Sequence, residues 1–198
     1  MENKRELTKS FWITWLFIIL VLIIAVAIGF GLFANRKEEK IVNEENGGNV
    51  VLNYSSNVAG LKIVNAAPTT DAVGVKKSED GDYFDFSVEC ELDNAASLEY
   101  ELSLIKNKKT STISDDDIRI YLEKEESGTY NAVFEPKGFE ALKKDNEYGT
   151  KAGEMVLVHT KKTKATTDHY RLRMWLKDQS LVNNGTYEVE INVTGISK

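Results

Sequence analysis

The sequence has few of the residues that crosslink small domains or bind metals. Its 198 residues include one cysteine, Cys90, so no disulfide can form within the chain, and two histidines, His159 and His169. A zinc site needs several His, Cys or carboxylate ligands at short spacings, and neither a His-Glu-x-x-His motif nor a cysteine pair is present. We therefore expect no metal and no other cofactor.

The common motifs of catalysis are also absent. There is no Gly-x-Ser-x-Gly elbow for a nucleophilic serine and no glycine-rich loop that could cradle phosphate. Without a nucleophile, a paired base or a cofactor motif, the sequence offers no route to a reaction. We predict that the protein is not an enzyme.

One long apolar segment is present, from Phe11 to Ala34. It contains no charged residue, and its 24 residues would form a helix of about 36 Å, enough to cross a hydrocarbon core of about 30 Å. It is longer than the apolar core of a cleaved signal peptide, and no convincing cleavage site ends it. We predict a cytoplasmic tail over 1–10, a transmembrane helix over 11–34 and a charged stalk over 35–49, helical for a turn or two.

The orientation of the predicted helix rests on its short N-terminal tail. Three basic residues lie on each flank, so the positive-inside count is a tie. Because a short basic tail before an N-terminal anchor usually stays in the cytoplasm, we expect the C-terminal domain outside the cell membrane. Trp12 and Trp15 would then be anchors at the cytoplasmic membrane interface.

The remaining residues carry an excess of negative charge. Residues 1–34 hold three basic and two acidic residues, which leaves 22 basic and 29 acidic residues beyond them, a net charge near −7. Such a surface repels nucleic acid and anionic lipid. We therefore expect no nucleic-acid partner.

From Val50 onward, apolar and polar residues alternate with the period of β-strands. The clearest runs lie at 84–92, 98–104, 118–122, 170–176 and 187–193, and weaker ones at 50–54, 61–65, 129–134 and 155–159. A short helix is expected at 137–144. Eight or nine strands, each with one apolar face, predict an all-β fold over 50–198, a two-sheet antiparallel sandwich of the immunoglobulin-like or jelly-roll type.

Charge patterns suggest how two pairs of strands are arranged. A hairpin of strands 83–92 and 98–104 would set Glu89 and Glu91 against two further glutamates, so we predict that the chain crosses between sheets over 93–97. A hairpin of the last two strands would set Arg171 and Arg173 beside the acids of strand 187–193, namely Glu188 and Glu190, and we predict that pairing.

Three further features carry predictions of their own. Cys90 is in phase with the apolar side of its strand, so we expect an inert buried thiol. Arg171, Arg173 and Trp175 alternate on one strand face and form the best candidate for partner binding, because Arg and Trp are enriched at binding hot spots. The acidic clusters at 79–82 and 115–117 could hold calcium, although neither has EF-hand spacing.

The closing segment YRLRMWLKDQSLVNNGTYEVEINVTG, Tyr170 to Gly195, resembles the ends of small exported β-sandwich proteins of Gram-positive bacteria. The segment is similar in pattern to camelysin and the TasA-like biofilm-fibre proteins, which are jelly rolls. The fibre proteins are cut after a signal sequence before they polymerise, whereas this chain lacks a convincing cut site. Camelysin is associated with proteolysis. We do not expect that activity in this chain, because it has no zinc-protease motif.

These observations predict a membrane-anchored extracytoplasmic β-sandwich with a binding or structural role at the cell envelope. Its partners would be the lipid bilayer, through the N-terminal helix, and an unknown protein or envelope component. One alternative is a subunit of a surface or biofilm fibre that self-associates by strand addition. A second alternative is a calcium-binding adhesion-type module.

Overall fold

The computed structural model describes Trp15, Ile19 and Val21 and residues 37–43, 48–54, 59–77, 82–92, 97–144, 153–182 and 184–197. The chain divides into two compact units, Met1–Arg36 and Lys37–Lys198. In the first unit, the three described residues are helical and about half exposed. Among the described residues, no helix has the length and apolar character needed to cross a membrane. The predicted tail, Trp12 and most of the predicted span at 11–34 lie outside them.

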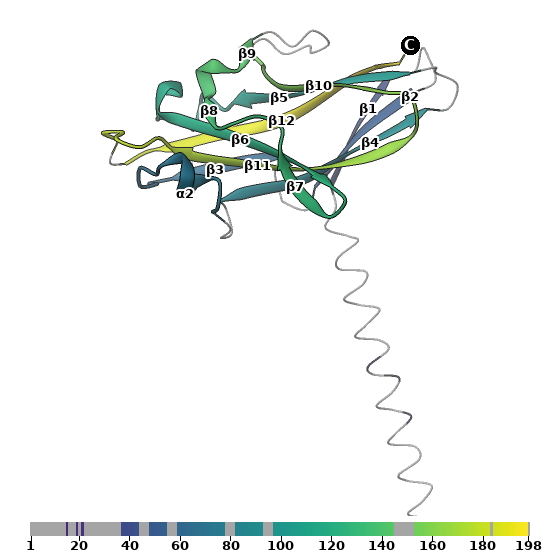
Figure 1. Cartoon of the computed structure of the whole chain (residues 1–198), viewed down its shortest axis with the longest axis horizontal. Coiled ribbons are helices and arrows are strands. Elements are labelled where there is room, and N and C mark those ends of the chain that lie inside the picture. Colours follow the sequence, from purple (N-terminus) through teal and green to yellow (C-terminus); the bar gives the residue numbers. More distant parts are fainter. Residues whose placement is uncertain are drawn as a thin grey trace, which may run out of the picture. The chain divides into compact units, whose positions relative to one another are not determined.

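The second unit contains two antiparallel sheets, of seven and five strands, in separate layers (Figure 1). In spatial order, the seven-stranded sheet holds β1 (Lys37–Asn43), β2 (Gly48–Tyr54), β4 (Tyr83–Leu92), β11 (Thr166–Leu176), β6 (Ile118–Glu126) and β7 (Thr129–Ala132), with β8 (Lys137–Gly138) also on β6. The five-stranded sheet holds β3 (Gly60–Val64), β12 (Thr186–Ser197), β5 (Leu98–Lys106), β10 (Met155–Lys162) and β9 (Lys143–Lys144). The helical turns are α2 (Asp71–Gly74), η1 (Asp115–Asp117) and η2 (Phe139–Ala141).

The strand order decides between the two predicted sandwich types, immunoglobulin-like and jelly roll. The eight strands β3–β7 and β10–β12 can be numbered 1 to 8 along the chain. In these numbers, the five-stranded sheet has the order 1-8-3-6 and the seven-stranded sheet the order 2-7-4-5. This is the order of a jelly roll, in which each long connection crosses from one sheet to the other. Strands β1 and β2 extend the seven-stranded sheet beside β4. The predicted all-β two-sheet sandwich is thus confirmed.

The core lies between the sheets and comes from the alternating positions that the sequence indicates. Side chains of Phe86, Val88, Leu102, Leu172 and Ile191, from four strands of the two sheets, are at most 4% exposed. Cys90 is 1% exposed in the same phase, which confirms its predicted burial. Beyond 137, the expected short helix is wrong, because the chain makes β8, the single turn η2 and β9 there.

The crossing predicted between strands 83–92 and 98–104 is confirmed, because β4 and β5 belong to different sheets. The acids that would have repelled each other instead meet amides of β2. Asn49 Nδ2 donates to Glu91 at 3.1 Å, and Asn53 Nδ2 donates to Glu89 at 3.4 Å. Neutral donors next to these carboxylates relieve the repulsion that a hairpin would have created.

The hairpin predicted for the last two strands is wrong. Strand β11 lies between β4 and β6 in the seven-stranded sheet, whereas β12 lies between β3 and β5 in the other. The basic residues of β11 find acids on their own sheet, and Glu188 of β12 pairs with Lys62 of β3 at 3.6 Å. The charges are balanced as expected, but by different strands.

The predicted stalk at 35–49 also needs correction. Residues Lys37–Asn43 form strand β1, which pairs with β2 from Lys37↔Tyr54 to Asn43↔Gly48. Charged residues are common on exposed edge strands, because they discourage pairing with other chains. The same composition therefore fits an edge strand, and the compact unit begins at Lys37 instead of Val50.

Candidate functional site on the outer face of the seven-stranded sheet

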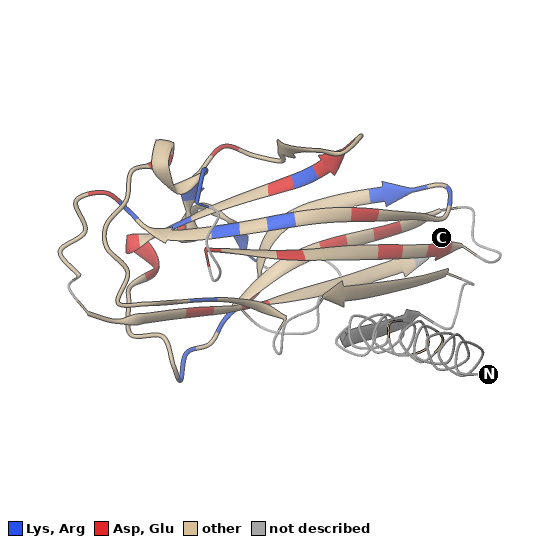
Figure 2. Ribbon diagram, turned by 90° about the horizontal axis from the view of Figure 1, so that it is seen from below, with Lys and Arg blue, Asp and Glu red and all other residues tan. Residues whose placement is uncertain are grey.

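The candidate recognition residues Arg171 and Arg173 lie on β11, a central strand of the seven-stranded sheet. The side chains of Leu172 and Met174 enter the core, so those of Arg171 and Arg173 lie on the opposite, outer face. Along the strands, basic (blue) and acidic (red) positions are separated by uncharged stretches (tan) (Figure 2). Asp85 of β4 and Glu123 of β6 pair with the two arginines, so charges of three strands meet on this face.

Arg171 is held by a carboxylate and two aromatic rings. Its Nε and Nη2 atoms donate to the two oxygens of Asp85 on β4, each at 2.7 Å. Its guanidinium carbon lies 4.3 Å from the ring centre of Tyr83 and 4.4 Å from that of Tyr130. The hydrogen bonds to Asp85 raise the pKa of Arg171, and stacking on tyrosine adds cation–π stabilisation.

Arg173 is more deeply buried than its neighbour, at 6% exposure. Its Nε atom donates to Glu123 of β6 at 2.9 Å, and its guanidinium lies 5.4 Å from the ring centre of Tyr83. Its Nη1 atom is buried and has no hydrogen-bond partner. A buried cationic donor without an acceptor is costly. Because Arg173 is enclosed, a partner docked on this face does not reach that atom.

Trp175 alternates with the two arginines on the same face of β11, as predicted, but it lies beneath α2. The indole is 1% exposed, and a Cβ atom added to Gly74 of α2 would come within 2.3 Å of its ring. Glycine is therefore required where α2 crosses the indole. Arg119 fixes α2 in this place, because its Nε donates to Asp71 at 3.0 Å and its Nη2 to the carbonyl of Pro136 at 2.6 Å. Trp175 is thus not available to a partner, while Arg171 is.

Of the two candidate membrane-interface anchors, Trp12 lies outside the described residues. Trp15 is helical and 51% exposed. Exposure of an indole on a helix is compatible with the predicted interfacial role. That role remains a prediction.

A second polar cluster, not anticipated from the sequence, lies between the sheets. The carboxylate of Asp168 on β11 is 6% exposed and accepts a 2.6 Å hydrogen bond from Tyr100 of β5. It also pairs with Lys124 at 2.9 Å and Lys162 at 2.5 Å, while Tyr100 and Tyr170 share a 2.7 Å hydroxyl contact. Burial alone would raise the pKa of Asp168, but the hydrogen bonds from the lysines and Tyr100 outweigh it and lower that pKa.

Cys90 is near this cluster, opposite Thr166 on the neighbouring strand. Burial, with a smaller contribution from the charge of Asp168, raises the pKa of the thiol to about 12. A thiol needs its deprotonated form to act as a nucleophile or a metal ligand. The geometry therefore favours the inert role expected for Cys90.

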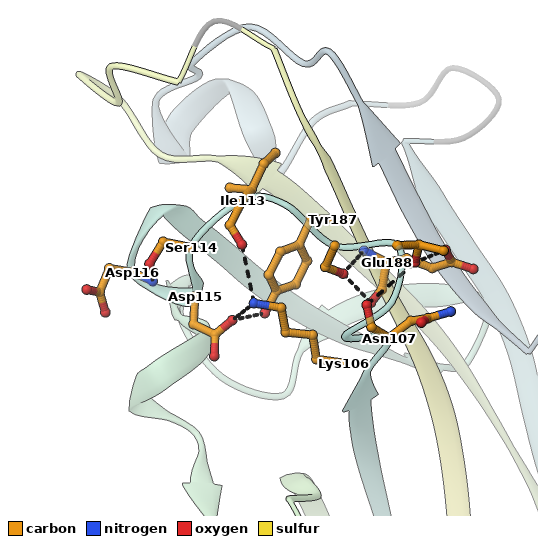
Figure 3. Close-up of polar contacts among 10 residues, drawn as sticks. Lys106, Asn107, Ile113, Ser114, Asp115, Asp116, Tyr187 and Glu188 are labelled. Atoms are coloured by element: carbon orange, nitrogen blue, oxygen red, sulfur yellow. Dashed lines mark hydrogen bonds and ion pairs between the residues drawn. The ribbon is translucent and has the colours of Figure 1, made fainter.

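The acidic cluster at 115–117 is divided among different partners. Asp115 accepts from Lys106 at 2.5 Å and from Tyr187 at 2.8 Å, whereas Asp116 points away (Figure 3). Asp117 accepts from Ser180 at 3.0 Å. No group of three or more metal-ligating side chains occurs among the residues that the structure describes, and 79–81 of the other cluster lie outside them.

The histidines occupy separate positions. His159 on β10 lies 3.5 Å from Glu99 and 3.8 Å from Glu101, both on β5, and His169 is exposed on β11. The two rings therefore belong to strands of different sheets.

Sequence reasoning missed the tyrosines and acids that surround the arginines. Tyr83 and Asp85 come from β4, and Tyr130 comes from β7, far from β11 in the chain. Only the strand pairing joins them, so no local pattern could have found the site. The sequence does contain a signal for Asp168. It alternates with Tyr170 and Leu172, so the strand period puts it on the side of the strand that faces the core. A scan against protein-family models finds no matching family, and a search of curated proteins finds no match.

Proposed function

We propose that this chain is a single-pass membrane protein with an extracytoplasmic jelly-roll domain, which binds a partner or serves structurally at the cell envelope. The observation that carries the proposal is the uncharged run from Phe11 to Ala34, followed almost at once by a compact β unit that begins at Lys37. A domain joined this closely to an anchor would be held at the membrane surface. The proposal includes no catalytic activity.

The binding role is supported by the outer face of the seven-stranded sheet. Arg171 and three half-buried tyrosines (Tyr83, Tyr121 and Tyr130) occur there. Arginine and tyrosine dominate binding hot spots, because they combine large contact area with hydrogen-bonding groups.

Membrane fractionation with intact-mass measurement tests the anchored form. We expect the chain in the membrane fraction, resistant to alkaline carbonate and released by detergent, with its N-terminal segment intact. A mature N-terminus beyond Ala27 in most molecules would overturn the anchor. Loss of a copurifying partner in an Arg171→Ala variant that folds normally would support the binding role.

A fibre subunit assembled by strand addition is the second candidate, and the position of β1 favours it. This strand is at the edge of the seven-stranded sheet and directly follows the apolar segment. An edge strand presents unpaired backbone groups that can pair with another copy. Crosslinking in a Lys40→Cys, Val51→Cys double variant, which joins β1 to β2, distinguishes the anchored monomer from the fibre. Crosslinks within one chain support the anchored monomer, and crosslinks between chains support the fibre.

A further inference from the structure

Three tyrosines lie around Arg171 on the outer face of the seven-stranded sheet. Tyr83 of β4 and Tyr121 of β6 flank Arg173, because both are its register partners. Tyr130 of β7 reaches across β6 and stacks on Arg171. All three tyrosines are half-buried, and their hydroxyl groups make no hydrogen bond with any described residue. We call these three tyrosines, with Arg171, the tyrosine face.

The strong charges beside the tyrosines are already paired. Asp85 accepts from Nε and Nη2 of Arg171, and Glu123 accepts from Arg173. An anion bound by Arg171 would have to displace Asp85, and a cation bound by Asp85 would have to displace Arg171. Either exchange breaks a bidentate arginine–carboxylate pair, which is among the strongest polar contacts in proteins. The pairing therefore disfavours charged ligands of both signs.

Two further contacts act in the same direction. Glu125, the register partner of Tyr130, has no ion pair with another described residue, so its charge repels anions such as phosphate polymers. The same charge attracts cations, but the place of a cation between aromatic rings is filled. The guanidinium carbon of Arg171 lies there, 4.3 Å from the ring centre of Tyr83 and 4.4 Å from that of Tyr130. A ligand that suits the tyrosine face is therefore neutral.

The paired residues keep hydrogen-bonding capacity for such a ligand. Nη1 of Arg171 makes no hydrogen bond with a described residue, and the side chain of Asp85 is 43% exposed. Each oxygen of Asp85 accepts one bond from Arg171 and retains a lone pair. Adjacent hydroxyl groups of a sugar can donate to this carboxylate and accept from the guanidinium. The tyrosines add ring surface and further hydroxyl groups.

We propose that the tyrosine face binds a neutral oligosaccharide, with sugar hydroxyl groups on Arg171 and Asp85 and sugar rings packed against the tyrosines. This ligand class rests on the binding role proposed above and specifies the chemistry of its partner. A sugar ring has apolar C–H surfaces and a polar rim. It therefore matches side chains that combine an apolar ring with a polar tip.

Isothermal titration calorimetry of the full chain tests the ligand class. The chain is held in phosphatidylcholine nanodiscs, because maltoside detergents are themselves sugars. Cellohexaose and chitohexaose are the neutral probes, deacetylated chitohexaose in mildly acidic buffer is the cationic probe, and hexagalacturonate is the anionic probe. We expect a neutral probe to bind about tenfold more tightly than either charged probe, because it leaves the pair of Arg171 and Asp85 intact.

Variants locate the bound sugar. Tyr130→Ala should weaken binding of the neutral probe about tenfold, and Tyr130→Phe, which keeps the ring, about threefold. The control is Asn131→Ala, which removes the next, exposed side chain of β7 on the opposite side of the strand and should leave affinity unchanged. The buried Cys90 reports folding, because its thiol becomes reactive on unfolding. Tyr121→Ala is the second variant if Tyr130→Ala does not fold.

Each failure has its own signature. If no neutral probe binds at millimolar concentration while Arg171→Ala loses a copurifying protein, the sugar ligand is overturned and the binding role stands. If no probe binds and Arg171→Ala loses no partner, both are overturned. A charged probe that binds as tightly as the neutral ones would overturn the neutral class. Equal weakening by Tyr130→Ala and Asn131→Ala would place the sugar elsewhere and overturn the tyrosine face.

Discussion

The carboxylate of Asp168 lies 2.6 Å from the hydroxyl of Tyr100, and the two residues belong to opposite sheets of the sandwich. Lys124 approaches the same carboxylate from the seven-stranded sheet and Lys162 from the five-stranded sheet. One buried charge therefore connects both layers. Its three contacts hold the sheets in register beside the hydrophobic core.

Replacement of this carboxylate should destabilise the fold. In Asp168→Asn, two lysines and a tyrosine hydroxyl lose their anionic partner, and breaking a buried pair costs about 3 kcal/mol. Urea unfolding should show this loss, while Asp178→Asn, at an exposed position, should change the free energy of unfolding by less than about 0.5 kcal/mol. An equal effect of both variants would contradict the bridging role.

The contribution of Asp168 should disappear in acid. Its folded pKa lies below the ordinary 3.8, so the stability it provides is present above the unfolded pKa and lost as the pH falls through the folded value. The difference in unfolding free energy between the native chain and Asp168→Asn should be constant from about pH 7 to 5 and shrink below about pH 4. A difference that grows in acid would show the opposite sign of shift.

Cys90 should be chemically silent in the native protein. With 1% exposure and a pKa of about 12, its thiol should react with Ellman's reagent only after unfolding. Cys90→Ala should cost about 1 kcal/mol, and Cys90→Asp several times more, because a buried unpaired charge replaces a small apolar group. Rapid labelling of the native chain would refute the assigned phase of β4.

A double-mutant cycle tests which strand faces β11. Arg173 contacts Glu123, so removing both side chains should reveal a coupling of about 1–3 kcal/mol. Arg173 and Glu190 lie in different sheets, and their coupling should be near zero. Strong coupling with Glu190 would restore the hairpin and contradict the jelly-roll order.

The contrast between two charge arguments shows where sequence reasoning succeeds. The repulsion of Glu89 and Glu91 by other glutamates correctly excluded a hairpin. Like charges on facing positions disfavour that one pairing, whichever strands become the neighbours instead. Attraction between Arg173 and Glu190 selected the wrong neighbour, since several strands offer acids and only topology decides among them. Periodicity, being local, correctly located the main strands.

Features that depend on distant contacts could not be predicted. The charged composition of β1 also fits a stalk, and only its pairing with β2 makes it a strand. The burial of Trp175 depends on α2, a four-residue helix too short to give a periodic signal. The pairing of Arg171 with Asp85 joins positions 86 residues apart.

The most direct test of the central claim is the side of the membrane on which the domain lies. A membrane-impermeant maleimide is added to protoplasts that express Asn131→Cys or Ser10→Cys, with Cys90 as the internal unreactive thiol. The account predicts labelling of residue 131 in intact protoplasts and of residue 10 only after lysis. Labelling of residue 10 in intact protoplasts, with residue 131 protected until lysis, would contradict it.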